Sequence, residues 1–322
     1  MRRGARIGLR RAAAALLLAL AACAPPEGED GIAGPARFLG AIRVDDVTPG
    51  DAGLSGLAVT PDGRRVTMID DRSFAWEARV RRDGMRPDRL GRVRRIALRR
   101  PDGRPMYGLD SEGLHVLPDG TLAVSYEGFH RILLHRPPDW RSEVLEAPTR
   151  LLRLPRNKGV EALAGAPDGT LYAIAEGRER GRHPLWRVSP DGRWTALAPV
   201  AAPGRFRPVG ADIGPDGRFY LLERRFGPLP RFATRVRSFR IGADGLADPR
   251  TVLLTAPGRF GNFEGIALWR DRQGRLRLLL VSDDNGWDWL AAELAEFVLP
   301  AEGPGPAEAP GEGGPTDAAR TP

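Results

Sequence analysis

A strand–turn–strand pattern recurs along this 322-residue chain and constrains its fold more than any other feature. Its clearest copies are residues 112–127 and 161–176. Each copy has an apolar stretch, a Pro-Asp-Gly turn, a second apolar stretch and an acidic residue at both ends. Proline presets φ and glycine accepts a positive φ, so this tripeptide favours a tight turn between antiparallel strands. The pattern therefore predicts repeated β-hairpins.

Five segments align on this pattern, and the residues that anchor the alignment are Gly56, Gly113, Ala162, Ala211 and Gly265. Their spacings are 57, 49, 49 and 54 residues. A period near 50 residues built from strand–turn–strand units is typical of a β-propeller. We expect an all-β chain that forms a β-propeller of four-stranded blades. Five blades are favoured, and six are possible if one long spacing hides a divergent blade.

Each repeat has room for two more strands. Residues 232–241 alternate polar and apolar side chains, as a half-buried strand does, and the turns at 190–192 and 243–245 fit second hairpins. Residues 38–44 are expected to pair with the last strand and close the ring. Residues 289–297 could form either a short helix or that last strand.

The two ends of the chain differ in composition from its centre. Residues 1–22 combine five arginines with a short Ala- and Leu-rich run, which predicts a signal peptide. The run ends in Leu-Ala-Ala-Cys and resembles a bacterial lipobox, so we expect Cys23 to be acylated and to anchor the protein in a lipid membrane. An ordinary signal peptide is the alternative. Residues 23–37 then form a Pro/Gly-rich tether, 38–300 the propeller and 301–322 a disordered tail.

Ala24 follows the cysteine in place of the Asp associated with inner-membrane retention, so we expect a lipid-anchored envelope protein at the outer membrane, facing the periplasm. The formal net charge of +8 falls to +3 without the five signal-peptide arginines. A nucleic-acid-binding protein usually carries a basic stripe with interleaved aromatic residues. The sequence contains none, and we expect no nucleic-acid partner.

Acidic residues at the outer ends of the hairpins predict a site. The start of one antiparallel strand lies beside the end of the next, so each pair of acids should meet opposite the turn. If the hairpins are innermost in their blades, these acids gather at one mouth of the central channel. The expected neighbours are Glu112 with Glu127, Glu161 with Glu176, Glu264 with Asp283 and Asp284, Asp212 with Glu223, and Ser55 with Asp70 and Asp71.

Such a cluster is costly because like charges raise one another's pKa. Arginines that follow the acids, such as Arg178 and Arg224, could compensate. A hard divalent cation such as Ca²⁺, which takes six to eight oxygen ligands, is the other candidate. Each single acid could instead cap a turn or pair with arginine. The sequence contains no nucleophile elbow, zinc-binding HExxH motif or P-loop.

Several motifs in order resemble those of the phytase-like family of bacterial propellers, often labelled "esterase-like activity of phytase". They are Asp-Ser-Glu-Gly-Leu at 110–114, Asn-Lys-Gly-Val-Glu at 157–161, Leu-Leu-Glu-Arg at 221–224, Asn-Phe-Glu-Gly-Ile at 262–266 and Ser-Asp-Asp-Asn at 282–285. The resemblance covers residues 38–300. It implies a propeller distantly similar to phytases that bind Ca²⁺ through acidic channel side chains and hydrolyse phosphate monoesters.

The hypothesis that follows is a metal-dependent hydrolase of small anionic phosphoric or carboxylic esters. The expected Ca²⁺ ligands come from Glu112, Glu161, Asp212, Glu223, Glu264, Asp283 and Asp284. Glu127 or Glu176 would accept a proton, and Arg178 or Arg224 would bind the anion. The alternatives are a non-enzymatic ligand-binding or scaffold propeller and a sugar-lactone hydrolase.

Overall fold

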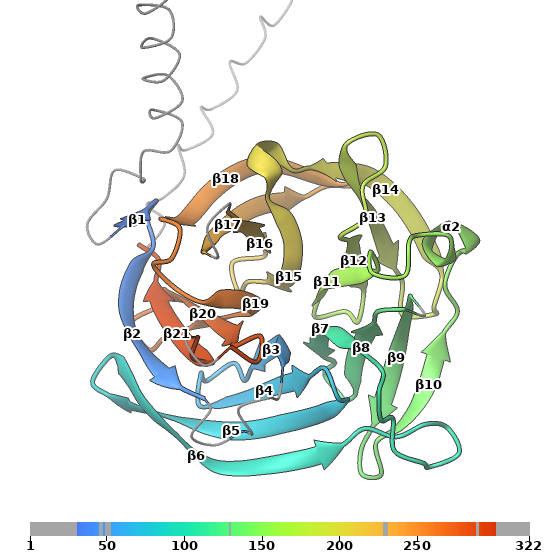
Figure 1. Ribbon diagram of the computed structural model, residues 1–322, viewed down its shortest axis with the longest axis horizontal. Coiled ribbons are helices and arrows are strands. Elements are labelled where there is room, and N and C mark those ends of the chain that lie inside the picture. The colour runs from blue at the N-terminus through green and yellow to red at the C-terminus, as the bar shows by residue number, and fades with distance from the viewer. Residues whose placement is uncertain are drawn as a thin grey trace, which may run out of the picture.

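Five antiparallel sheets of four strands surround a central axis in the computed structural model, which describes residues 31–44, 48, 53–128, 130–227, 231–287 and 290–300 (Figure 1). The fold is a five-bladed β-propeller, as the hairpin period predicts. In blades 1 to 4 the strands follow in chain order from the axis outward, with the first strand of each hairpin innermost.

Blade 1 consists of β3 (Leu54–Val59), β4 (Arg65–Asp70), β5 (Phe74–Asp83) and β6 (Arg86–Ala97). Blade 2 consists of β7 (Ser111–Val116), β8 (Leu122–Tyr126), β9 (Arg131–Arg136) and β10 (Arg141–Leu145). Blade 3 consists of β11 (Val160–Gly165), β12 (Leu171–Ala175), β13 (Arg182–Val188) and β14 (Trp194–Ala201). Blade 4 consists of β15 (Arg207–Ile213), β16 (Phe219–Phe226), β17 (Phe232–Ile241) and β18 (Leu246–Thr255). Blade 5 consists of β19 (Asn262–Arg270), β20 (Leu276–Asp283), β21 (Glu293–Val298) and the N-terminal β2 (Arg37–Arg43).

The ring closes through β2, which pairs antiparallel with β21 and places Ala41 opposite Ala295. This confirms the predicted closure. Of the two options left open for residues 289–297, a helix or the last strand, the structure has the strand over residues 293–298. Part of the predicted tether is also paired, because β1 (Ile32–Ala33) joins the outer edge of blade 4 at β18. The predicted signal peptide, Cys23 and the C-terminal tail lie outside the described residues.

The aspartate side chain of each hairpin turn stabilises that turn through a hydrogen bond to the backbone. Asp119 Oδ1 accepts a hydrogen bond from Thr121 N at 2.9 Å, and Asp168 Oδ1 accepts one from Thr170 N at 2.9 Å. The glycine after each aspartate has a positive φ, 84° at Gly120, a conformation that other residues rarely adopt. Side-chain-to-backbone bonds of this kind explain why Asp-Gly recurs at the turn.

A β-bulge interrupts every inner strand at the same height. In each hairpin the innermost strand has one extra residue, which lies near the end of the neighbouring second strand. A small residue follows this extra residue in the sequence. Alanine or glycine is needed there because inner strands approach closely: a Cβ on Gly113 would lie 2.7 Å from the Leu163 Cβ. The extra residues are Ser55, Glu112, Glu161, Val209 and Glu264, and the small ones are Gly56, Gly113, Ala162, Gly210 and Gly265. Gly210, and not the expected Ala211, therefore anchors the fourth repeat.

Apolar side chains fill the spaces between adjacent blades. Leu222 of blade 4 packs in one cluster with Phe263 and Phe297 of blade 5, and all three are buried. Burying each such side chain contributes about 1.5–3 kcal/mol to stability. Helical structure is limited to α2 (Thr149–Leu152) and η2 (Pro203–Arg205) within the described ranges. None of the helices there is long and apolar enough to cross a membrane.

Candidate functional site at the channel mouth

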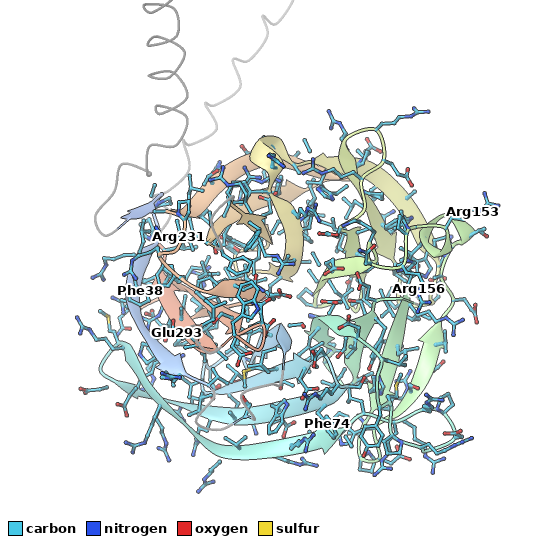
Figure 2. All side chains as sticks on the ribbon, viewed as in Figure 1. Phe38, Phe74, Arg153, Arg156, Arg231 and Glu293 are labelled. Atoms are coloured by element: carbon cyan, nitrogen blue, oxygen red, sulfur yellow. The ribbon has the colours of Figure 1, made fainter. Side chains whose placement is uncertain are left out.

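The bulges place acidic side chains at one end of the central channel. Glu112, Glu161 and Glu264 occupy equivalent bulge positions in blades 2, 3 and 5. Just beyond the bulge, the backbone N–H of Glu127 donates to Asp110 O at 2.8 Å, and that of Glu176 donates to Gly159 O at 2.9 Å. Figure 2 shows the side chains on the ribbon of the ring, in the same view as Figure 1. The predicted pairings 112/127 and 161/176 are therefore confirmed at the level of the strand ends.

Three of these carboxylates form a compact group. Asp110, Glu112 and Glu127 each offer an oxygen, and these atoms lie within 4.8 Å of one another. Glu161 lies close enough to Glu127 for the two carboxyl groups to share a hydrogen bond. No lysine or arginine of the described chain forms an ion pair with these four acids. The donor set is all oxygen and anionic, which is what Ca²⁺ prefers.

Burial and mutual repulsion disfavour the charged forms of these groups. Burial raises the pKa of Glu112 and of Glu161 well above the usual value, and the neighbouring carboxylates add to the effect. The pKa values of Glu127 and Asp110 are raised for the same two reasons. Burial, and then the charge of Glu264, raises the pKa of Asp283 to about 7. Ionising the whole cluster therefore costs free energy unless a cation or protons compensate.

Blade 4 makes the mouth asymmetric. Val209 takes the bulge position that glutamates occupy elsewhere, and two paired arginines, Arg207 and Arg224, stand at the strand ends. Arg224 Nη1 donates to Asn262 Oδ1 at 2.8 Å and to the Glu264 carboxylate. Burial lowers the pKa of Arg224, but the combined negative charges of Glu264, Glu161, Glu176 and Glu112 outweigh burial and leave this pKa raised. One side of the opening is thus basic, while blades 2 and 3 supply the acidic side.

Glu176 belongs to the basic side. Its carboxylate accepts hydrogen bonds from Lys158 Nζ at 2.5 Å and from Arg207 Nη1 at 2.7 Å. Burial alone would raise the pKa of Glu176, but these two cations outweigh burial and leave the pKa lowered. A carboxylate held this firmly in its charged form is a weak proton acceptor, so its predicted catalytic role remains a prediction with little support from the geometry.

Two predicted site residues lie elsewhere, and the expectation that Asp212 and Glu223 are neighbours is wrong. The register pairs Glu223 with Pro208 and Asp212 with Tyr220, because Asp212 lies near the turn of the hairpin and Glu223 lies near its open end. Glu223 is fully buried and accepts hydrogen bonds from Arg235 and Arg237, each 2.7 Å from Oε2. Asp212 accepts hydrogen bonds from Leu268 N and Ile213 N, and burial raises its pKa to about 7. Both hold strands together.

Other predicted residues have contacts of their own. Arg178 donates to His183 Nε2 at 3.2 Å and to Phe206 O at 2.9 Å. Asp284 Oδ1 accepts from Gly286 N at 2.8 Å, which fixes the turn after Asp283. Asp70 accepts from Trp76 Nε1 at 2.8 Å and caps the end of β4. These hydrogen bonds give Arg178, Asp284 and Asp70 structural roles at the ends of strands and in turns.

The sequence pattern did not single out Asp110 as a ligand or Arg207 as part of the mouth. Asp110 lies one residue before β7. Because Ser111 pairs with Tyr126, continuing this register by one residue pairs Asp110 with Glu127, so the sequence could have indicated it. Arg207 could not have been indicated in this way, because it depends on the bulge at Val209, which leaves no mark in the hairpin pattern.

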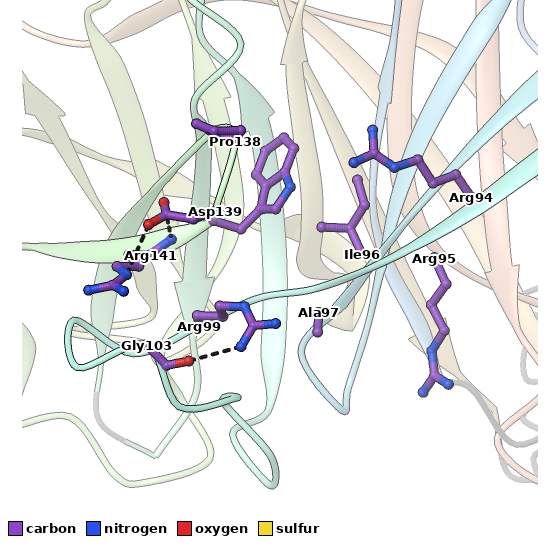
Figure 3. A pocket seen from close by; sticks show the side chains of 10 residues that line it. Arg94, Arg95, Ile96, Ala97, Arg99, Gly103, Pro138, Asp139 and Arg141 are labelled. Carbon is purple, nitrogen blue, oxygen red and sulfur yellow. Dashed lines mark hydrogen bonds and ion pairs between the residues drawn. The ribbon is translucent and has the colours of Figure 1, made fainter.

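An arginine-rich pocket of about 420 Å³ lies far from the axis, between β6 and the turn before β10. Figure 3 shows Arg94, Arg95, Arg99 and Arg141 around it. Arg141 pairs with Asp139 at 2.9 Å, and Arg99 donates to Gly103 O at 2.9 Å. The pocket is separate from the channel mouth.

Comparisons with known proteins identify a family and several similar solved structures. The family model described as "Phytase-like: Esterase-like activity of phytase" matches residues 50–286. No curated protein matches the chain. Among solved structures, a luciferin-regenerating enzyme is similar at 10% identity over 81% of this chain and 95% of its own, with a TM-score of 0.49. An α-L-arabinofuranosidase from Podospora anserina is similar at 11% identity over 82% and 97%, with a TM-score of 0.48.

Proposed function

This chain belongs to the family described as "Esterase-like activity of phytase", and from that premise we propose that its channel mouth is a divalent-metal-dependent ester hydrolase site. The substrate class is a small anionic phosphoric or carboxylic ester. The observation that carries the proposal is the group of Asp110, Glu112 and Glu127, whose oxygens lie within 4.8 Å of one another without a paired cation in the described chain.

Asp110, Glu112 and Glu127 would hold a Ca²⁺ ion, with Glu161 beside them. A bound Ca²⁺ would polarise an ester oxygen and make a nearby water more acidic. Glu112 and Glu127 are partly exposed and keep a face open to water, and Glu161 is buried beside Glu127. The ligands predicted at Asp212 and Glu223 do not belong to this proposal, because those carboxylates face other partners.

The remaining roles fall to residues around the cluster. Arg224, fixed by Asn262 and Glu264, would bind an anionic oxygen of the ester. Glu161 would take one proton from the attacking water as the water oxygen bonds to the phosphorus or acyl carbon. The bond to the leaving alcohol breaks, the alcohol takes up a proton, and the products are an acid and an alcohol.

The test is an assay of the purified protein on a generic phosphate ester and a short acyl ester, with Ca²⁺ and with a chelator. We expect turnover of at least one substrate that disappears with chelator and in Glu112→Gln. Glu143→Gln is the matched control, because Glu143 is exposed and pairs with Arg136 on the outer part of blade 2. Turnover on neither substrate with metal would overturn the proposal.

Two other outcomes would redirect the assignment. Metal-dependent turnover of a sugar lactone alone would identify the lactone hydrolase alternative. Absence of any metal binding would favour the ligand-binding or scaffold alternative, which expects arginine to neutralise most mouth acids. Ion pairs within the described ranges reach Glu176 and Glu264 but none of Asp110, Glu112, Glu127 and Glu161, and this gives that alternative only partial support.

We also propose that the protein acts at the bacterial envelope, anchored through a lipid on Cys23. The support is the sequence alone, because Cys23 lies outside the described residues. Metabolic labelling with a radioactive fatty acid tests it. Label in the wild-type protein and none in Cys23→Ser is expected, and equal label in both would contradict acylation at this residue.

A further inference from the structure

A cavity of about 490 Å³ lies on the basic side of the channel mouth. Its polar lining consists of Arg205, Arg207, Arg224 and Glu176. Its apolar lining consists of Phe226, Phe232 and Trp287. Three of these residues, Arg207, Arg224 and Glu176, already belong to the site described above, so the cavity opens next to the acidic cluster.

The polar lining carries two positive charges more than negative ones. Glu176 is ionised because Lys158 and Arg207 lower its pKa. A guanidinium has five N–H donors, and the hydrogen bonds of Arg207 and Arg224 within the described chain use Nη1 only. Arg205 is exposed and forms no ion pair with a described residue. N–H donors of these arginines therefore remain available to bind an anion. The excess of two positive charges matches an anion of charge about minus two.

The opposite wall is aromatic. The ring centroids of Phe226 and Phe232 are 5.0 Å apart, and those of Phe232 and Trp287 are 6.3 Å apart at an interplanar angle of 30°. Phe226 is 55% exposed and Trp287 is 36% exposed. Exposing large aromatic side chains costs free energy unless a ligand or partner covers them. A flat apolar group would gain both burial and stacking there.

We propose that this pocket binds a small aryl phosphate-type dianion, with its anionic group on the arginines and its ring on the aromatic wall. The inference names a substrate class and rests on the proposed function for turnover, but binding itself does not. The pocket suits a polyphosphorylated polyol poorly. Two excess charges cannot neutralise many phosphates, and the aromatic wall offers a polyol few polar partners.

Calorimetric titration with phenylphosphonate, which cannot be hydrolysed, tests binding in the presence of a chelator at about pH 8, where the ligand is a dianion. We expect one site. Phe226→Ala and Arg205→Gln should each weaken binding by at least about fivefold. Both side chains are exposed, and thermal melting checks that the variants fold. The matched controls Tyr107→Ala and Arg64→Gln, exposed residues of other regions, should stay within about twofold.

Benzoate and inositol hexakisphosphate give two further arms. Weaker binding of benzoate supports the charge argument, and equal binding overturns it. Inositol hexakisphosphate that binds more tightly than phenylphosphonate, with no effect of Phe226→Ala, overturns the inference. Phenylphosphonate binding without any metal-dependent hydrolysis would leave this pocket standing while removing the proposed catalysis. Metal-dependent hydrolysis of phenyl phosphate that is unaffected by Phe226→Ala would support the proposed catalysis and overturn the proposed binding pocket.

Discussion

At the scale of single residues, chemically similar acids have different roles that only their neighbours reveal. Glu112 and Glu223 are both glutamates of inner hairpins. Glu112 lies among other carboxylates, whereas Glu223 lies between two buried arginines. A repeat pattern marks both positions as acidic, but the choice of partner depends on β17, which supplies Arg235 and Arg237 from beyond the hairpin.

Replacement of Glu223 by Gln should therefore destabilise the fold without changing metal affinity. Removing the carboxylate leaves two buried guanidinium groups uncompensated, and breaking such a buried pair costs about 3 kcal/mol or more. Urea unfolding measures the loss. Glu143→Gln, at an exposed pair, should change stability by less than about 0.5 kcal/mol. A Glu223→Gln protein as stable as the wild type would contradict the structural role of this residue.

At the scale of elements, the hairpins follow from local sequence and the bulges do not. A Pro-Asp-Gly turn and two flanking apolar stretches are enough to predict β7–β8 and β11–β12. A bulge adds one residue to a strand without changing its composition. The sequence alignment of the fourth repeat was therefore shifted by one residue and overlooked Val209 and Arg207. Asp212, the acid assigned to the mouth, lies three residues beyond the bulge position.

The glycine after the bulge in β7 gives a test at this scale. Gly113→Ala should destabilise the protein by about 1–3 kcal/mol, because the new methyl group would press on the Leu163 side chain of the next blade. Gly91→Ala is the control, since a Cβ there meets no atom within 4 Å. Thermal and urea unfolding compare the two. Equal stability of both variants would show that inner strands are packed less closely than described.

At the scale of the whole molecule, the ring concentrates negative charge at one end of its axis. In the metal-free protein the pKa of Asp283 rises from 3.8 to about 7, and burial raises those of Glu112 and Glu161 in the same direction. At these acids the folded state then binds more protons than the unfolded state between these values. These acids therefore make stability fall as pH rises from about 4 to about 7, whereas His115 and His135, whose pKa values burial lowers to about 4, act in the opposite sense below about pH 6.5.

We expect the change in stability of the metal-free protein from pH 5 to pH 8 to be about 2 kcal/mol more favourable in Asp283→Asn than in the wild type, measured by urea unfolding. The lowered pKa of Glu176 acts in the opposite sense, but below its usual value of 4.5 and so outside this interval. The same pH dependence of stability in Asp283→Asn and in the wild type would refute the repulsion described here.

The central claim is that Asp110, Glu112 and Glu127 hold a divalent cation, and calorimetric Ca²⁺ titration of chelator-treated protein tests it most directly. The account predicts one saturable site in the wild type and in Glu143→Gln, with affinity at least about tenfold weaker in Glu112→Gln. Heats no larger than dilution in the wild type, or an unchanged affinity in Glu112→Gln, would contradict it.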